Sequence, residues 1–163
     1  MRLSTRSEFG LMAVASIGLV VAGLVLGELL NLQPCPLCIF QRVLYLVIAI
    51  FAVGGALLPG WRSLWGGLVG LTAAGGMATA FYQSWLQFAP DVSKECGFGE
   101  PTLIEQLVDW LGMQWPAMFM ATGFCSSKEW VFLGLSMANW SIVCFLGFLL
   151  LAGWLLLKRD LLR

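Results

Sequence analysis

Four long, almost uncharged stretches dominate the pattern of this chain; two short segments and one long one separate them. The stretches, of which the first is interrupted only by Glu28, are 9–30, 43–61, 63–90 and 131–157. A helix needs about 20 mainly apolar residues to cross a bilayer. The pattern therefore predicts an all-α membrane protein, a four-transmembrane-helix bundle with spans over about residues 10–30, 40–60, 64–84 and 136–157.

The composition supports this class of protein. Of the 163 residues, 60% are hydrophobic and 11% are charged, whereas soluble domains carry roughly 25% charged residues. Nine Lys and Arg against nine Asp and Glu give a net charge of zero, so the chain lacks the basic surface expected of a nucleic-acid-binding protein. The chain has no His, which removes the commonest general base and metal ligand.

The basic residues predict the orientation of the spans, because cytoplasmic loops are enriched in Lys and Arg. Four spans place both termini and the turn after the second span on the same side of the membrane. The basic residues of these segments are Arg2, Arg6, Arg62, Lys158, Arg159 and Arg163. The long segment 85–135 on the other side is acidic. We therefore expect both termini in the cytoplasm and two outer loops, at about 31–39 and 85–135. Arg2, Arg6 and Ala13-Val14-Ala15 also resemble a secretory signal, but the apolar run continues beyond them, which favours a retained span.

Four of the five cysteines fall in the outer loops, where disulfides persist. Cys35 and Cys38 form a Cys-x-x-Cys motif in the first loop, and the second loop contains Cys96 and Cys125. Cys144 lies inside the fourth span, where a free Cys is typically a small packing residue.

The first motif has the features of a redox centre. Cys38 is expected near a helix N-terminus, which favours a thiolate, and Arg42 follows one helical turn later. A zinc site with four cysteine ligands and a pair of purely structural disulfides are the alternatives. Haem attachment requires a His after the second Cys, where this chain has Ile39.

The second outer loop is predicted to contain a short amphipathic helix. Thr102 and Glu105 fit a capping box, and Leu103, Leu107 and Leu111 recur at helical spacing, with Glu105, Gln106 and Asp109 elsewhere on the surface. The apolar residues that follow, from Trp110 to Met120, are too few to span and predict a segment in the membrane interface. Glycines such as Gly97 and Gly123 predict mobile flanks beside Cys96 and Cys125.

With these features assembled, the chain resembles the DsbB family of bacterial inner-membrane disulfide-forming proteins. The resemblance rests on the sequence PCPLCIFQR at 34–42, the second cysteine pair, and the sequence WPAMFMATGFC at 115–125. It implies a multi-pass inner-membrane protein whose cysteine loops are periplasmic.

The resemblance also implies a relay of disulfides. A reduced periplasmic DsbA-like thiol oxidase attacks the Cys96–Cys125 disulfide at Cys96, and the released Cys125 exchanges with Cys35. Cys38 is then left as the thiolate that faces ubiquinone or menaquinone. The matching arginine, Arg42, is expected to support quinone binding. Thiolate attack drives such exchange.

One position departs from part of the family. Some members have a His linked to quinone near the outer end of the third helix, where this chain has Gln83. Gln83 can donate a hydrogen bond but cannot gain charge. Proton delivery is therefore unassigned, and Glu28 is either a relay group or a headgroup-level residue. A related oxidoreductase with a different dedicated partner, and a non-catalytic four-span protein with structural disulfides, are the alternative functions.

Overall fold

The computed structural model describes residues 4–88, 102–128 and 130–160. Residues 158–160 are described through their backbone alone. Its long helices are α1 (Thr5–Leu30), α2 (Pro36–Leu57), α3 (Arg62–Phe88) and α6 (Met137–Asp160). Four helical segments of the described chain are long and apolar enough to cross a membrane. The predicted class, an all-α protein with four membrane-spanning helices, is confirmed.

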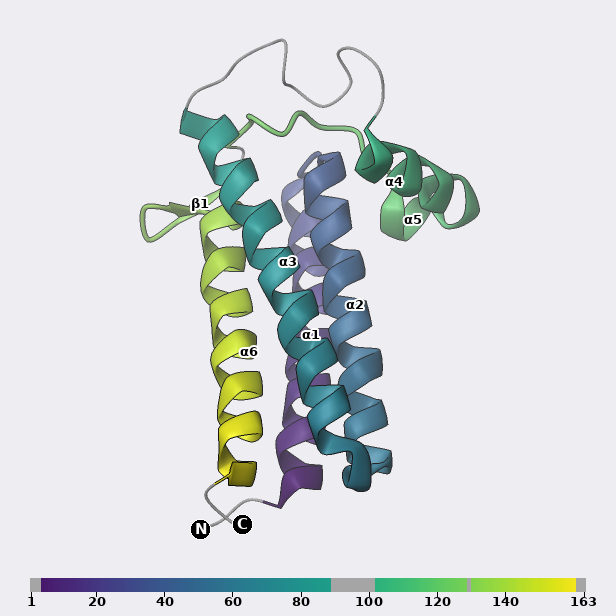
Figure 1. Cartoon of the computed structure of the whole chain (residues 1–163). Coiled ribbons are helices and arrows are strands. Elements are labelled where there is room, and N and C mark those ends of the chain that lie inside the picture. The colour runs from purple at the N-terminus through teal and green to yellow at the C-terminus, as the bar shows by residue number, and fades with distance from the viewer. Residues whose placement is uncertain (1–3, 89–101, 129, 161–163) are drawn as a thin grey trace.

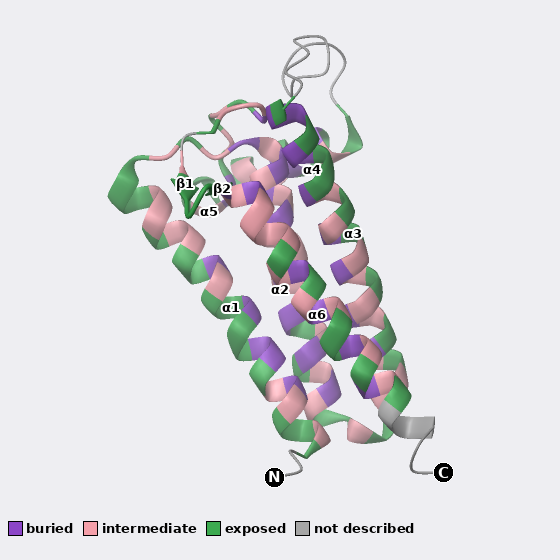
Figure 2. Cartoon of the chain, turned by 90° about the vertical axis from the view of Figure 1, so that its left-hand side faces the viewer, coloured by how far each residue is buried: buried purple, intermediate pink, exposed green. Residues whose placement is uncertain are grey.

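The four helices lie side by side in one bundle (Figure 1). α3 packs along both α6 and α2, and α1 packs along α2. The start of α1 and the end of α6 are at one end of the bundle (Figure 1). The opposite end, called the cysteine end below, carries the start of α2. Figure 2 shows that α1 inclines away from α6 toward the cysteine end.

Large aromatic rings and small residues meet in the centre of the bundle. Tyr45 of α2 stacks on Phe145 of α6 with ring centroids 4.2 Å apart. Gly76 of α3 lies against the Phe145 ring, so closely that a Cβ there would overlap it. The outward faces are also apolar, as Leu11 and Leu71 illustrate at 61% and 73% exposure. Such a surface is stable in lipid rather than in water.

The helix ends follow from local chemistry. Ser4 caps the start of α1, and Asn31 ends it in the left-handed conformation, which Asn tolerates better than most residues. α2 begins at Pro36, earlier than the predicted span near 40, because Pro suits the first helical position. A 3-10 turn, η1 (Pro59–Trp61), joins α2 to α3. α3 continues past residue 84 to Phe88.

Smaller elements cover the cysteine end. They are α4 (Leu103–Gln114), α5 (Pro116–Phe119) and an antiparallel pair of β1 (Val131–Phe132) and β2 (Leu135–Ser136). The hairpin was not expected from the sequence. Its turn has positive φ at both Leu133 and Gly134, which is the geometry of a type I′ turn.

The capping box that begins α4 is present, with Thr102 and Glu105 bonded reciprocally. The helically spaced leucines of α4 differ in environment. Leu103 is 84% exposed, whereas Val108 is fully buried, and Leu111 packs in the same apolar cluster as Val108. Glu105, expected on the surface, is buried. The capping bonds hold its carboxylate against Thr102, which offsets the cost of burying it.

Candidate thiol site

The Cys-x-x-Cys motif forms the first turn of α2. Cys35 is the N-cap, in extended conformation with φ −88° and ψ 163°, as expected for a residue before a proline. Its sulfur accepts a hydrogen bond from the backbone N–H of Cys38 at 3.3 Å. The Cys35 thiol donates to the Cys38 sulfur at 2.9 Å, and both are free cysteines. The predicted position of Cys38 near a helix N-terminus agrees with this geometry.

The two thiols are inequivalent. Cys35 is 2% exposed, while Cys38 is half-buried. The hydrogen bond to Cys38, and then burial, raise the pKa of the Cys35 thiol well above its usual value. Cys35 therefore holds its proton and shares it with Cys38, which is placed as the acceptor.

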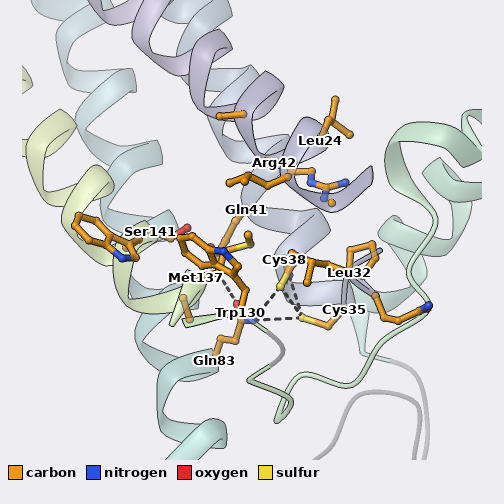
Figure 3. Close-up of a pocket in the computed structure, with 18 of the residues that line it drawn as sticks. Leu24, Leu32, Cys35, Cys38, Gln41, Arg42, Gln83, Trp130, Met137 and Ser141 are labelled. Carbon is orange, nitrogen blue, oxygen red and sulfur yellow. Dashed lines mark hydrogen bonds between the residues drawn. The ribbon is translucent and has the colours of Figure 1, made fainter. Parts of the chain in front are cut away.

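Two buried glutamines continue this hydrogen-bond chain. The side-chain Nε2 of Gln83 donates to the Cys38 sulfur at 2.9 Å and to the Cys35 sulfur at 3.4 Å. The Nε2 of Gln41 in α2 donates a hydrogen bond to Gln83 Oε1 at 2.8 Å. Because the Gln83 oxygen is occupied by Gln41, its NH₂ group faces the sulfurs, as Figure 3 shows. Gln83, expected at the quinone, thus contacts the thiols directly.

Gln41 was not identified as a functional residue from the sequence. It is 4% exposed, and Gln83 is 3% exposed. The available signal was an uncharged amide between Phe40 and Arg42, three residues after Cys38. Buried amides need hydrogen-bond partners, so this residue implied a second polar group on a neighbouring helix.

Arg42 borders the same cavity as Cys38. Its Nη1 donates to the backbone carbonyl of Met118 in α5 at 3.1 Å. A Cβ added at Gly27 would lie 3.9 Å from Nη2, so the guanidinium is beside the backbone of α1. A guanidinium has five N–H donors, and the Met118 contact leaves donors for a ligand in the cavity.

The cavity has a volume of about 540 Å³, within the roughly 300–1,000 Å³ of small-molecule sites. Its walls come from α1, α2, α3, α6 and the segment that bears Cys125 (Figure 3). Apolar side chains such as Leu19 and Leu24 line its deeper part, and Cys38 and Arg42 line the part at the cysteine end. Glu28, an exposed residue of α1, also borders it.

The remaining cysteines differ in environment. Cys125 is fully buried and is disulfide-bonded. It shares one buried cluster with Cys35, Leu37 and Leu86. Cys96 lies outside the described residues. Cys144 packs against the main core, as expected for a filler, and also borders the cavity.

The expectation of a mobile flank before Cys125 is wrong at Gly123. This residue packs so tightly against the backbone of Gln33 that a Cβ would lie 2.8 Å from the Gln33 carbonyl carbon. The glycine therefore permits a close approach of two backbones, a use that the sequence alone does not distinguish from flexibility. Gly97 lies outside the described residues.

Known proteins of one family are similar to this chain over nearly its whole length. The model of the family "Disulfide bond formation protein DsbB" matches residues 5–155. The chain is 48% identical over 159 residues to Disulfide bond formation protein B of Dechloromonas aromatica (strain RCB), covering 98% of this chain and 96% of the relative. The protein of the same name from Azoarcus sp. (strain BH72) is 39% identical over 145 residues, 86% of each chain. That from Nitrosomonas europaea is 37% identical over 160 residues, 96% of each. The chain therefore belongs to the DsbB family of disulfide bond formation proteins.

Proposed function

We propose that this protein reoxidises a periplasmic DsbA-like dithiol protein and transfers the electrons to membrane quinone, either ubiquinone or menaquinone. The observation that supports this most directly is the position of Cys38. Its sulfur accepts hydrogen bonds from Cys35 and Gln83 and borders a cavity that Arg42 also lines. A thiol so placed can lose electrons to a ligand in the membrane.

The relay proposed from the family proceeds through two cysteine pairs. The thiolate of the reduced partner attacks Cys96, and the Cys96–Cys125 bond breaks, which releases Cys125 as a thiolate. Cys125 then attacks Cys35 of an oxidised Cys35–Cys38 pair, and Cys38 leaves as a thiolate. Each exchange forms one S–S bond and breaks one. The partner's second thiol displaces Cys96 and completes the partner's oxidation. The freed Cys96 thiolate then attacks Cys125 of the Cys35–Cys125 disulfide, which restores the Cys96–Cys125 bond and releases Cys35, so that Cys35 and Cys38 are left as a dithiol.

The residues around the cavity fit a quinone. The apolar deeper wall, from Leu19 to Leu24, suits an isoprenoid tail, and the Arg42 guanidinium can hold a carbonyl oxygen. When bound, a quinone supplies a two-electron acceptor for the dithiol. The Gln83 NH₂ group stabilises negative charge on Cys38 sulfur, and Gln41 keeps that NH₂ group oriented. This assigns Gln83 to the sulfur side of the site.

The proposed topology places the cysteine end in the periplasm and both termini in the cytoplasm of a bacterial inner membrane. It rests on the basic residues of the termini and on Arg62 at the start of α3. The exposed side chains of Leu103, Trp110 and Met113 on α4 then lie at the level of the lipid headgroups. Amphipathic helices of this kind bind in the interface plane.

A quinone-reduction assay tests the proposal. The purified protein in lipid nanodiscs, supplied with a soluble ubiquinone and a reduced DsbA-like protein, should consume quinone as partner disulfide appears. Cys35→Ser and Cys38→Ser should abolish turnover, and Gly60→Ala, in η1 at the other end of the bundle, is the control outside the cavity and should retain it. Full activity of either motif variant would refute the redox function. Structural disulfides would instead stay oxidised when reduced partner is added without quinone, as alkylation and mass mapping would show.

A further inference from the structure

The segments that carry Cys125 and Cys35 are bound together by their backbones. The N–H groups of Thr122 and Gly123 both donate to the carbonyl oxygen of Pro34, at 2.9 and 3.1 Å. That carbonyl belongs to the peptide bond that joins Pro34 to Cys35. The two hydrogen bonds are therefore made to the residue directly before Cys35, whose sulfur is attacked in the proposed relay.

Gly123 is the residue that permits this contact. A Cβ on it would overlap the Gln33 carbonyl oxygen and lie 3.0 Å from the Gln33 Cβ. Because the obstacle is backbone, no rotation of a side chain can relieve it. Any larger residue must separate the two segments, and Gly123 is only two positions before Cys125.

The Cys35 side of the contact is rigid. Proline fixes φ at both Pro34 and Pro36, and Cys35 between them is held extended as the N-cap of α2. The two backbone hydrogen bonds thus connect the Cys125 segment to a backbone of fixed geometry. In the same region Cys35 and Cys125 belong to one buried cluster with Leu37 and Leu86, which excludes water from the space around their sulfurs.

We propose that Gly123, docked on Gln33 and Pro34, is a positioning residue for disulfide exchange between the two loops. The inference rests on the proposed relay and deepens it. In this step the Cys125 thiolate attacks the Cys35 sulfur, the Cys35–Cys125 bond forms, and the Cys35–Cys38 bond breaks with Cys38 leaving as a thiolate. No electrons leave the protein. The docked backbones raise the effective concentration of Cys125 at Cys35, as intramolecular positioning does in general.

The equilibrium constant for forming the Cys35–Cys125 disulfide measures how strongly Gly123 positions the two thiols. In a chain with Cys38→Ser, Cys96→Ser and Cys144→Ser, only Cys35 and Cys125 can pair. Equilibration in glutathione buffers gives the effective concentration of one thiol at the other. Adding Gly123→Ala should lower it at least tenfold. The matched control is Gly60→Ala, in the turn at the far end of the bundle, where a Cβ has nothing within 4 Å, and it should change the value less than twofold.

A second assay separates this inference from the proposed function. Dithiothreitol can reduce the Cys35–Cys38 disulfide without the second loop. Thr122 and Phe124, on either side of Gly123, line the cavity, so the rates are compared at saturating quinone. Under that condition Gly123→Ala in the otherwise unchanged protein should keep its dithiothreitol-driven quinone reduction within twofold. Its partner-driven rate should fall at least tenfold. An unchanged effective concentration would overturn the inference, as would loss of both rates, since the defect would then not be local to exchange. If the unmodified protein reduced no quinone with either reductant, the proposed function itself would fail.

Discussion

Replacing Gln83 by leucine tests the hydrogen-bond chain at the thiols most sharply. The substitution keeps an apolar side chain in the buried position and removes the NH₂ group that donates to Cys38 at 2.9 Å. A hydrogen bond to a charged group contributes about 1.5–3 kcal/mol, and about 1.4 kcal/mol corresponds to a tenfold change in rate. Gln83 is 3% exposed, so water has little access to replace the donor. We expect dithiothreitol-driven quinone reduction to slow about 10- to 150-fold.

The matched control is Gln87→Leu, one turn further along α3. Gln87 is also buried, but it donates to the Ser127 carbonyl at 3.1 Å and accepts from Ser136 at 2.7 Å. Its replacement removes a buried amide of the same size without touching the thiol pair. Equal losses of rate in Gln83→Leu and Gln87→Leu would refute the role assigned to the sulfur contact.

A further variant separates stability from chemistry. Gln83→Leu strands the Nε2 donor of Gln41 in the core, which costs about 1–3 kcal/mol. Adding Gln41→Leu removes that unpaired group, so the double variant should recover thermal stability in detergent. Its rate should remain as low as that of Gln83→Leu, because the donor to Cys38 is still missing. Recovery of the rate together with the stability would show that the single variant was slow only because its core was disturbed.

Three other predictions follow from the site and the core. Arg42→Ala should raise the quinone KM about tenfold or more, with partner binding unchanged by titration; an unchanged KM would count against quinone contact. Gly76→Ala should destabilise the bundle by about 1–3 kcal/mol by overpacking, measured as thermal unfolding in detergent, whereas Gly75→Ala, with open space around its Cβ, should not. The hydrogen bond to Cys38 raises the pKa of Cys35, so Cys38→Ala should move the pH profile of Cys35 alkylation to lower pH. An unchanged pH profile would mean that burial alone raises the pKa of Cys35.

The sequence predicted the four helices because a membrane imposes a simple requirement, a charge-free run of sufficient length. It also predicted the capping box at Thr102, which depends on residues three apart. Helix boundaries were less accurate at α2, where Pro36 starts the helix before the apolar run becomes continuous. Local rules thus accounted for the elements but gave little information about how they meet.

The polar contacts of the site were missed because they join distant parts of the chain. Gln41 and Gln83 are 42 positions apart, and neither residue alone indicates the other. Gly123 was misjudged for a related reason. A glycine in a loop is compatible with mobility or with close packing, and the distinction depended on Gln33, which approaches it from another loop.

The absence of His from the sequence has a physical consequence once the amides are considered. An imidazole beside Cys38 would change its charge between about pH 5 and 8, whereas the Gln83 NH₂ group donates equally throughout that range, and Arg42 stays charged. The groups that stabilise a Cys38 thiolate are thus insensitive to pH. The pH dependence of quinone reduction should then arise from the thiols themselves and from proton supply. We therefore expect the residue that delivers protons to quinone to differ from the amide and the guanidinium that stabilise the thiolate.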